Sequence, residues 1–117
     1  MKTPIELITE TREYYEGDPS LRAKSDTACF YFDTTTGNTC AVGRCMTTGP
    51  WLDFIGDFEE IRKNYQLNEV LRPEYHNIPH SLWNALQDWH DSDLNFTLTG
   101  LTAKGKLQIE NLLSLYK

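Results

Sequence analysis

Apolar and polar positions follow helical spacing from the start of the chain. The side of a helical projection that we expect to face the core holds Leu7, Ile8, Thr11, Tyr14 and Tyr15. Thr3 is a suitable N-cap, Pro4 suits the first helical position, and Glu6 completes a capping box. The pattern predicts a helix that begins at residue 4 and ends at the Gly-Asp-Pro sequence of residues 17–19.

Three later segments carry apolar stripes of the same kind. A stripe from residue 54 to residue 65 predicts a helix that starts near Asp57. Residues 81–90 predict another helix, and Thr102 is the expected cap of a last one. The connection before residue 81 contains two prolines, and we expect one helical turn in it at 68–71. The inward positions of the last two helices are Leu82, Leu86, Trp89, Ile109, Leu112, Leu113 and Tyr116.

The segment from Cys29 to Met46 does not follow helical spacing throughout. Residues 29–33 are rich in aromatics and predict a short strand, and turn-forming residues follow it. Residues 39–46 fit either the second strand of a hairpin or a helix, and we favour the helix because period-2 alternation is weak. A further short strand is expected at 95–98. The sequence therefore predicts a single α+β domain over residues 1–117, predominantly helical, with four to five helices and a small β hairpin or strand element.

The charge balance is acidic, with seventeen Asp and Glu against eleven Lys and Arg and a net charge of −6. Proteins bind nucleic acids largely by neutralising phosphates with Lys and Arg, so direct nucleic-acid binding is not expected. An anionic membrane surface is not expected as a partner for the same reason. The charge favours a protein partner with a basic surface, and the sequence leaves the oligomeric state open.

The cysteines number three, and the N-terminus shows no secretory signal pattern. No run approaches the roughly 18–20 apolar residues that a membrane helix needs. These observations predict a cytoplasmic protein with free thiols.

Cys40 is the strongest candidate for a catalytic group. If Thr39 caps a helix, the Cys40 thiol lies in its first turn, where exposed N–H groups lower the pKa of a thiol. One of three downstream histidines, His76, His80 or His90, would then serve as its general base. The alternative is that Cys40 is a small buried core residue, because no local signature of a thiol enzyme surrounds it. Binding is therefore favoured over catalysis.

Metal-binding patterns are incomplete. Cys40 and Cys45 are five residues apart, a spacing that does not direct both thiols to one zinc ion on a helix or a strand. The acidic stretch 91–95 opens like a calcium loop, but Phe96 stands where the loop needs Gly. We expect no metal site and no other cofactor.

Glutamates gather on the outer side of the first predicted helix. Glu6, Glu10, Glu13 and Glu16 lie within about 120° of one another at helical spacing. Such a face can dock on a basic protein surface, although most acidic helix faces are only solvated. Trp83 marks a different candidate, a small-ligand pocket between the helix that carries it and the 29–46 segment.

Two blocks of the chain resemble segments of small uncharacterised proteins encoded by bacteriophages and bacteria. The first runs from Cys29-Phe30-Tyr31 through Gly37 to Cys40-Ala41-Val42-Gly43-Arg44-Cys45, and the second comprises residues 86–91 and 100–105. The resemblance implies a small, phage-encoded protein that acts in the cytoplasm of the host cell, and it assigns no role to any residue. The sequence thus favours an acidic binding protein in an interaction, inhibitor or accessory role. A cysteine-dependent hydrolase or transferase and a small-ligand binding protein are the alternatives.

Overall fold

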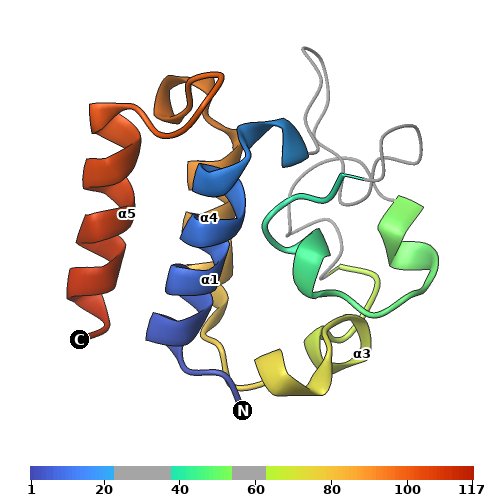
Figure 1. Ribbon diagram of the computed structural model, residues 1–117. Helices are drawn as coiled ribbons and strands as arrows, with labels where there is room; N and C mark the ends of the chain where they lie inside the picture. The colour runs from blue at the N-terminus through green and yellow to red at the C-terminus, as the bar shows by residue number, and fades with distance from the viewer. Residues whose placement is uncertain (23–37, 54–62) are drawn as a thin grey trace.

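Four α-helices and five short 3-10 helices make up the regular structure of the residues that the computed structural model describes, which are 1–22, 38–53 and 63–117 (Figure 1). The α-helices are α1 (Pro4–Gly17), α3 (Leu67–Val70), α4 (His80–Asp91) and α5 (Ala103–Leu115). The 3-10 helices are η1 (Pro19–Leu21), η2 (Gly43–Cys45), η3 (Pro50–Asp53), η4 (Pro73–Tyr75) and η5 (Asp93–Asn95). Within these ranges no helix has the length and apolar character needed to cross a membrane.

The boundaries of α1 follow from its capping residues. Thr3 Oγ1 accepts a hydrogen bond from the Glu6 backbone N–H at 3.2 Å, and Glu6 Oε1 accepts one from the Thr3 N–H at 3.1 Å. The hydrogen bond from the Thr3 backbone lowers the pKa of the Glu6 carboxyl. Asp18 follows the helix, and its side chain accepts a hydrogen bond from the Ser20 N–H at 3.1 Å, at the start of η1. The predicted capping box and helix end are confirmed.

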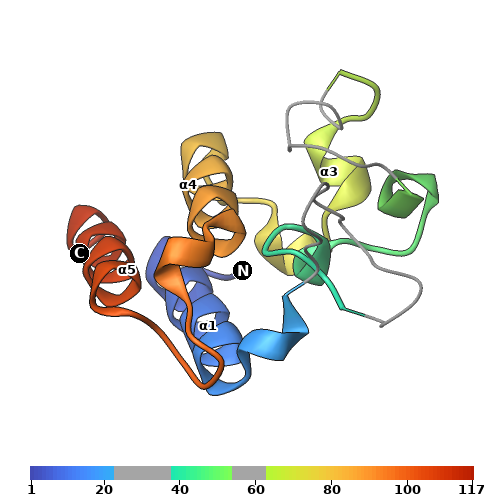
Figure 2. The ribbon, with the colours of Figure 1, turned by 90° about the horizontal axis from the view of Figure 1, so that it is seen from above.

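The three longest helices, α1, α4 and α5, pack against one another (Figures 1 and 2). The segments 38–53 and 63–78, which include α3, lie together on the other side of α1 and α4 (Figure 2). Trp83 and Trp89 are the largest fully buried side chains of the described core. Both project from α4, so α4 is the element around which the remaining helices bury their apolar sides.

The connection from α4 to α5 brings two backbones close together. The Trp89 indole N–H donates to Gly105 O at 3.0 Å, and the Thr102 N–H donates to Asn95 O at 2.9 Å. Thr102 Oγ1 accepts from the Gly105 N–H at 3.0 Å, which confirms Thr102 as the cap of α5. An added Cβ at Gly105 would lie only 2.2 Å from Asn95 O. Glycine is required here because no side chain fits between α5 and η5.

The predicted α+β class is wrong, because the described residues form helices and no strand. Three isolated bridges stand where strands would be needed, at Arg22–Thr39, Met46–Leu71 and Phe96–Leu101. Each bridge is one residue pair long because helical turns or caps begin or end beside it, as η2 ends at Cys45 and η5 ends at Asn95. A strand needs several consecutive extended residues, and these short connections do not provide them. The expected strand at 95–98 is thus reduced to the bridge at Phe96.

The predicted helix over 39–46 is also wrong, apart from the short turn η2. Gly43 lowers helix propensity at the centre of the segment. Part of the backbone pairs internally, as the Arg44 N–H donates to Cys40 O at 2.9 Å, but other backbone groups of the segment pair with side chains from elsewhere. Tyr15 Oη donates to Thr39 O at 2.6 Å, and Gln87 Oε1 accepts from the Val42 N–H at 3.3 Å. Tertiary hydrogen bonds therefore determine the path of this segment.

The other predicted elements have mixed outcomes. The helical turn at 68–71 and the helices at 81–90 and after Thr102 are confirmed as α3, α4 and α5. Tyr14, expected to face inward, is 37% exposed. The expected strand at 29–33 and most of the helix that was to start near Asp57 lie outside the described residues.

Replacement of Gly105 tests the close approach of α5 to η5. We expect Gly105→Ala to destabilise the protein by about 1–3 kcal/mol, because overpacking costs more than the roughly 1 kcal/mol that Ala gains over Gly in a helix. Gly17→Ala is the matched control, since an added Cβ there meets nothing within 4 Å. Urea unfolding of both variants measures the difference, and equal stability of the two would contradict the described packing.

Candidate functional site

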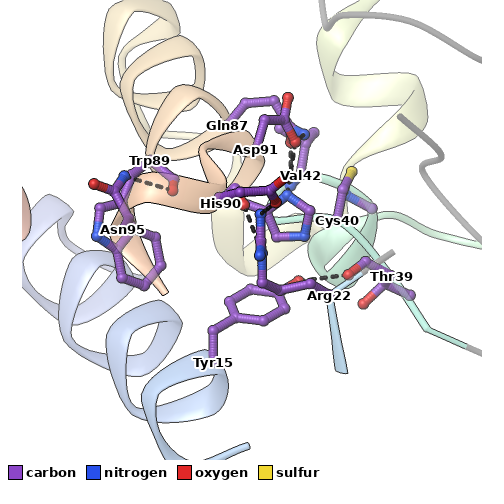
Figure 3. Close-up of polar contacts among 12 residues, drawn as sticks. Tyr15, Arg22, Thr39, Cys40, Val42, Gln87, Trp89, His90, Asp91 and Asn95 are labelled. Carbon is purple, nitrogen blue, oxygen red and sulfur yellow. Dashed lines mark hydrogen bonds and ion pairs between the residues drawn. The ribbon is translucent and has the colours of Figure 1, made fainter. Parts of the chain in front are cut away.

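Buried polar groups meet where α1, α4 and residues 38–46 come together (Figure 3). We call this set the junction network, and it comprises Tyr15, Arg22, Gln87, His90, Asp91 and the backbone of residues 39–42. Tyr15 and His90 are completely buried, and Gln87 is 3% exposed. Polar groups at this depth need hydrogen-bond partners, because leaving one unsatisfied costs about 1–3 kcal/mol. The junction network therefore fixes how the three parts of the chain meet.

Gln87 connects the loop to the end of α4. Its Oε1 accepts from the Val42 N–H at 3.3 Å, and its Nε2 donates to Asp91 Oδ1 at 2.8 Å. Gln87 and Asp91 are four residues apart on α4, so both side chains lie on the same helix face. A single amide thus satisfies a buried backbone donor and a carboxylate at once.

His90 and Asp91 form a histidine–carboxylate pair. His90 Nδ1 lies 2.7 Å from Asp91 Oδ1. An ionised carboxylate only accepts hydrogen bonds, so Nδ1 is the donor of this pair, and Nε2 is the nitrogen that can act as a base when the ring is neutral. A carboxylate that orients a histidine in this way is the arrangement that supports a general base.

Tyr15 links this pair to the loop and to Cys40. Its ring lies edge-on to the His90 ring, with centroids 4.9 Å apart, and its hydroxyl donates to Thr39 O. Burial raises the pKa of the Tyr15 hydroxyl well above its ordinary value, and the charge of the neighbouring Cys40 adds to the shift. Cys40 and His90 therefore share a neighbour although fifty residues separate them in sequence.

Arg22, the residue that follows η1, is the last member of the junction network. Its Nε donates to His90 O at 2.8 Å, which satisfies a carbonyl in the last turn of α4. Its Nη2 pairs with Asp93 at 3.1 Å, and the guanidinium lies 4.3 Å from the centroid of the Phe96 ring. The side chain combines a hydrogen bond, an ion pair and a cation–π contact, so it fastens η1 to both α4 and η5.

The candidate nucleophile Cys40 is completely buried, and no α-helix starts at it. Its Sγ accepts a hydrogen bond from the Gly43 N–H at 3.2 Å. Cys45 is equally buried, and its Sγ lies 3.8 Å from Ala41 O. Burial raises the pKa of the Cys45 thiol to about 11. Neither Cys40 nor Cys45 is part of a disulfide.

The other two candidate histidines have local partners. His76 Nε2 lies 2.9 Å from Leu71 O, and His80 Nε2 lies 3.2 Å from Asn84 Nδ2. Among the parts of the chain that the structure describes, no group of three or more His, Cys, Asp or Glu side chains is placed to hold a metal ion. Of the candidate bases, His90 is the one that the junction network includes.

The four candidate glutamates of α1 have different roles. Glu10 turns toward the protein, where its Oε1 lies 3.4 Å from Arg44 Nη2. Glu16 pairs with an arginine one turn earlier at 3.5 Å, and Glu6 caps the helix. Glu13 is exposed. The acidic face is therefore smaller than the spacing predicts, because internal ion pairs use part of it.

Trp83, the other candidate binding residue, belongs to the core. It is completely buried, and its ring lies edge-on to Tyr75 with centroids 6.0 Å apart. The aromatic pair stabilises the contact between α4 and η4.

A surface feature that the sequence reasoning missed lies between α4 and α5. Leu98 is 98% exposed at the tip of the turn formed by residues 97–100, which we call the Leu98 turn. The Thr97 N–H donates to Gly100 O at 2.7 Å, and Thr97 Oγ1 accepts from the Thr99 and Gly100 N–H groups at 3.2 and 3.0 Å. The only sequence signal was a leucine placed between the turn-forming residues Thr97 and Gly100.

Two hollows flank the Leu98 turn. The first, of about 440 Å³, is lined by Pro19, Ser20, Arg22, Asp93, Phe96, Thr97 and Leu98. The second, of about 450 Å³, lies against α1 and is lined by Arg12, Glu16, Thr97, Thr99, Gly100, Leu101, Lys106 and Glu110. Leu98 lines the first hollow together with Asp93 and Arg22. The second hollow is lined by two carboxylates and two cations.

Comparisons of the chain with protein-family models, with curated proteins and with solved structures find no match. Function must therefore be argued from the geometry of this chain.

The buried Cys45 thiol predicts a loss of stability in alkali. In the folded protein its pKa is about 11, above its ordinary 9.0. The stability that this shift contributes is therefore complete below pH 9 and is lost as the pH rises through 11. We expect the free energy of unfolding of the wild type to fall about 2–3 kcal/mol more than that of Cys45→Ala over this interval. Urea unfolding at stepped pH measures the two slopes.

Val42→Ala is the matched control, because it truncates the same core without removing an ionisable group. This variant should keep the wild-type pH slope. If the free energy of unfolding fell equally with pH in the wild type and in Cys45→Ala, the raised pKa of the Cys45 thiol would be contradicted.

Proposed function

We propose that this protein acts by binding another protein with a basic surface, and not by catalysis. The observation that carries the proposal is the Leu98 turn, which presents an almost fully exposed leucine on a hydrogen-bonded backbone. Single exposed apolar residues are common on protein surfaces. Leu98 differs from such residues because its turn is already ordered by hydrogen bonds. Little backbone entropy is therefore lost when a partner covers it.

The acidic balance of the chain favours a partner of positive charge. The Asp93 side chain is 77% exposed although it pairs with Arg22. Glu16 borders the hollow on the α1 side, and Glu13 is exposed one turn earlier. Asp93 and Glu16 each pair with an arginine, so the attraction of a basic surface comes from the net charge of −6 over the whole chain.

The burial of the reactive groups supports binding over catalysis. Cys40, Cys45 and His90 have no exposed surface. A substrate would reach them only after α1, α4 and the 38–46 segment separate, which breaks the hydrogen bonds of the junction network. The resemblance to small phage-encoded proteins extends the proposal to an inhibitor or accessory role in the cytoplasm of a host cell.

Replacement of Leu98 tests this proposal. Host lysate is passed over the immobilised wild type, Leu98→Asp and the matched control Asn77→Asp, which changes another exposed residue. We expect partners that bind the wild type and the control to bind Leu98→Asp at least about tenfold more weakly, because a charge replaces the apolar anchor. Binding should also weaken as salt rises from low to physiological concentration. Identical partner sets and affinities for all three proteins would count against the proposal.

A second candidate function is a cysteine-dependent hydrolase or transferase with Cys40 as nucleophile and His90 as base. The specific observation that favours it is the His90–Asp91 pair at 2.7 Å, beside the Tyr15 ring that both Cys40 and His90 neighbour. Such an enzyme would need to expose Cys40 during its cycle.

Site-resolved alkylation decides between the two functions. If the protein acts by binding, we expect iodoacetamide to leave Cys40 and Cys45 equally unlabelled in the folded protein near neutral pH, and to label both in urea. Cys45 serves as the internal reference, because its raised pKa keeps it protonated. Faster labelling of Cys40 that drops to the Cys45 rate in His90→Gln would support the thiol enzyme.

A further inference from the structure

The Leu98 turn stands between the two hollows that flank it. Figure 1 shows the connection from α4 to α5 at the end of the three-helix group opposite the two termini of the chain. Thr97 lines both hollows, one of about 440 Å³ on the side of η1 and one of about 450 Å³ on the side of α1. Leu98, the next residue, is 98% exposed. The surface falls away on both sides of the turn, so the Leu98 side chain is a projection and not part of a flat apolar patch.

This shape restricts the kind of partner that the turn can bind. A flat protein surface resting on Leu98 would leave both hollows full of water and would bury little besides one side chain. Stable interfaces bury roughly 800 Å² on each partner, far more than one leucine supplies. A partner must therefore surround the turn, with a cavity over Leu98 and a rim that enters the two hollows. The centre of an interface packs as densely as a protein interior, so this cavity would match a leucine in size.

The linings of the hollows indicate the chemistry of that rim. In the first hollow Phe96 lies beside the ion pair of Arg22 and Asp93, whose atoms are 3.1 Å apart. The second hollow is lined by two carboxylates and two cations. A rim that enters both hollows must carry polar groups, whereas the cavity over Leu98 must be apolar. An apolar centre inside a polar rim is the usual anatomy of a protein interface.

One side chain fixes the backbone of the turn before a partner arrives. Thr97 Oγ1 accepts hydrogen bonds from the Thr99 and Gly100 N–H groups and donates one to Gly100 O at 3.1 Å. A segment that enters a cavity binds best when it already has its bound shape. We propose that the Leu98 turn inserts into a leucine-sized apolar cavity of a protein partner. This inference rests on the proposed function and adds the shape and chemistry of the site on the partner.

A series of side-chain sizes at residue 98 tests the cavity. A partner captured from host lysate by the wild type is purified, and its affinity for the wild type and each variant is measured by biolayer interferometry. Leu98→Met keeps the side-chain volume and should bind within about threefold of the wild type. Leu98→Ala leaves the cavity partly empty and Leu98→Trp is too large for it, so both should bind at least about tenfold more weakly.

Leu98→Trp separates this inference from the proposed function. A flat partner surface would bind the tryptophan as tightly as the leucine or more tightly, because tryptophan offers more apolar area. That result, with a partner that Leu98→Asp still loses, would overturn the cavity and leave the proposed function intact. If Leu98→Asp retains every partner, both fail. Residue 98 is almost fully exposed, so all variants should unfold at the wild-type temperature.

A pair of matched variants tests the preformed shape of the turn. Thr97→Val removes the oxygen that the two N–H groups share, so we expect the partner to bind at least about threefold more weakly. Thr99→Val makes the same change two residues later. Thr99 donates its backbone N–H to Thr97, and its hydroxyl has no hydrogen-bond partner among the described residues. This control should bind as the wild type does, and equal affinities of the two variants would contradict a preformed turn.

Discussion

The need to satisfy polar groups buried along α4 is the constraint on which the rest of the structure depends. Gln87 and His90 lie on this helix among tryptophans and leucines, and Asn95 follows it, completely buried. Asn95 donates to Trp89 O at 2.9 Å, and Gln87 reaches both Val42 and Asp91. An unpaired polar group at any of these positions would destabilise the fold by an amount comparable with a large share of its total stability. The hydrogen bonds therefore select one arrangement of α1, the 38–46 segment and η5 around α4.

This constraint also separates the chemically reactive groups from the surface. Cys40 and His90 are completely buried where the three packed segments of the junction network meet. Exposed leucines are instead found on the last third of the chain, at Leu94, Leu98, Leu107 and Leu115.

The parts of the fold that depend on neighbours in sequence were predictable, and the parts that depend on distant neighbours were not. The capping box at Thr3 and Glu6 and the cap at Thr102 involve atoms three residues apart, so the sequence pattern is sufficient. Residues 39–46 were misassigned because their backbone partners, Tyr15 and Gln87, come from helices 24 and 45 residues away. The α+β class was wrong for the same reason, since only single bridges form where strands were expected.

The candidate site likewise combines features that the sequence predicts with features that only the folded chain decides. The sequence by itself determined the acidic charge, the three long described helices, the caps of α1 and α5, and the candidate residues Cys40 and His90. Only the tertiary structure decided that Glu10 turns inward to Arg44, that Asp91 orients His90, and that Leu98 stands free on its turn. The physical reason is that residue type and spacing fix local backbone geometry and total charge. The burial of a side chain, which decides whether it packs, binds or reacts, depends on segments that only the folded chain brings together.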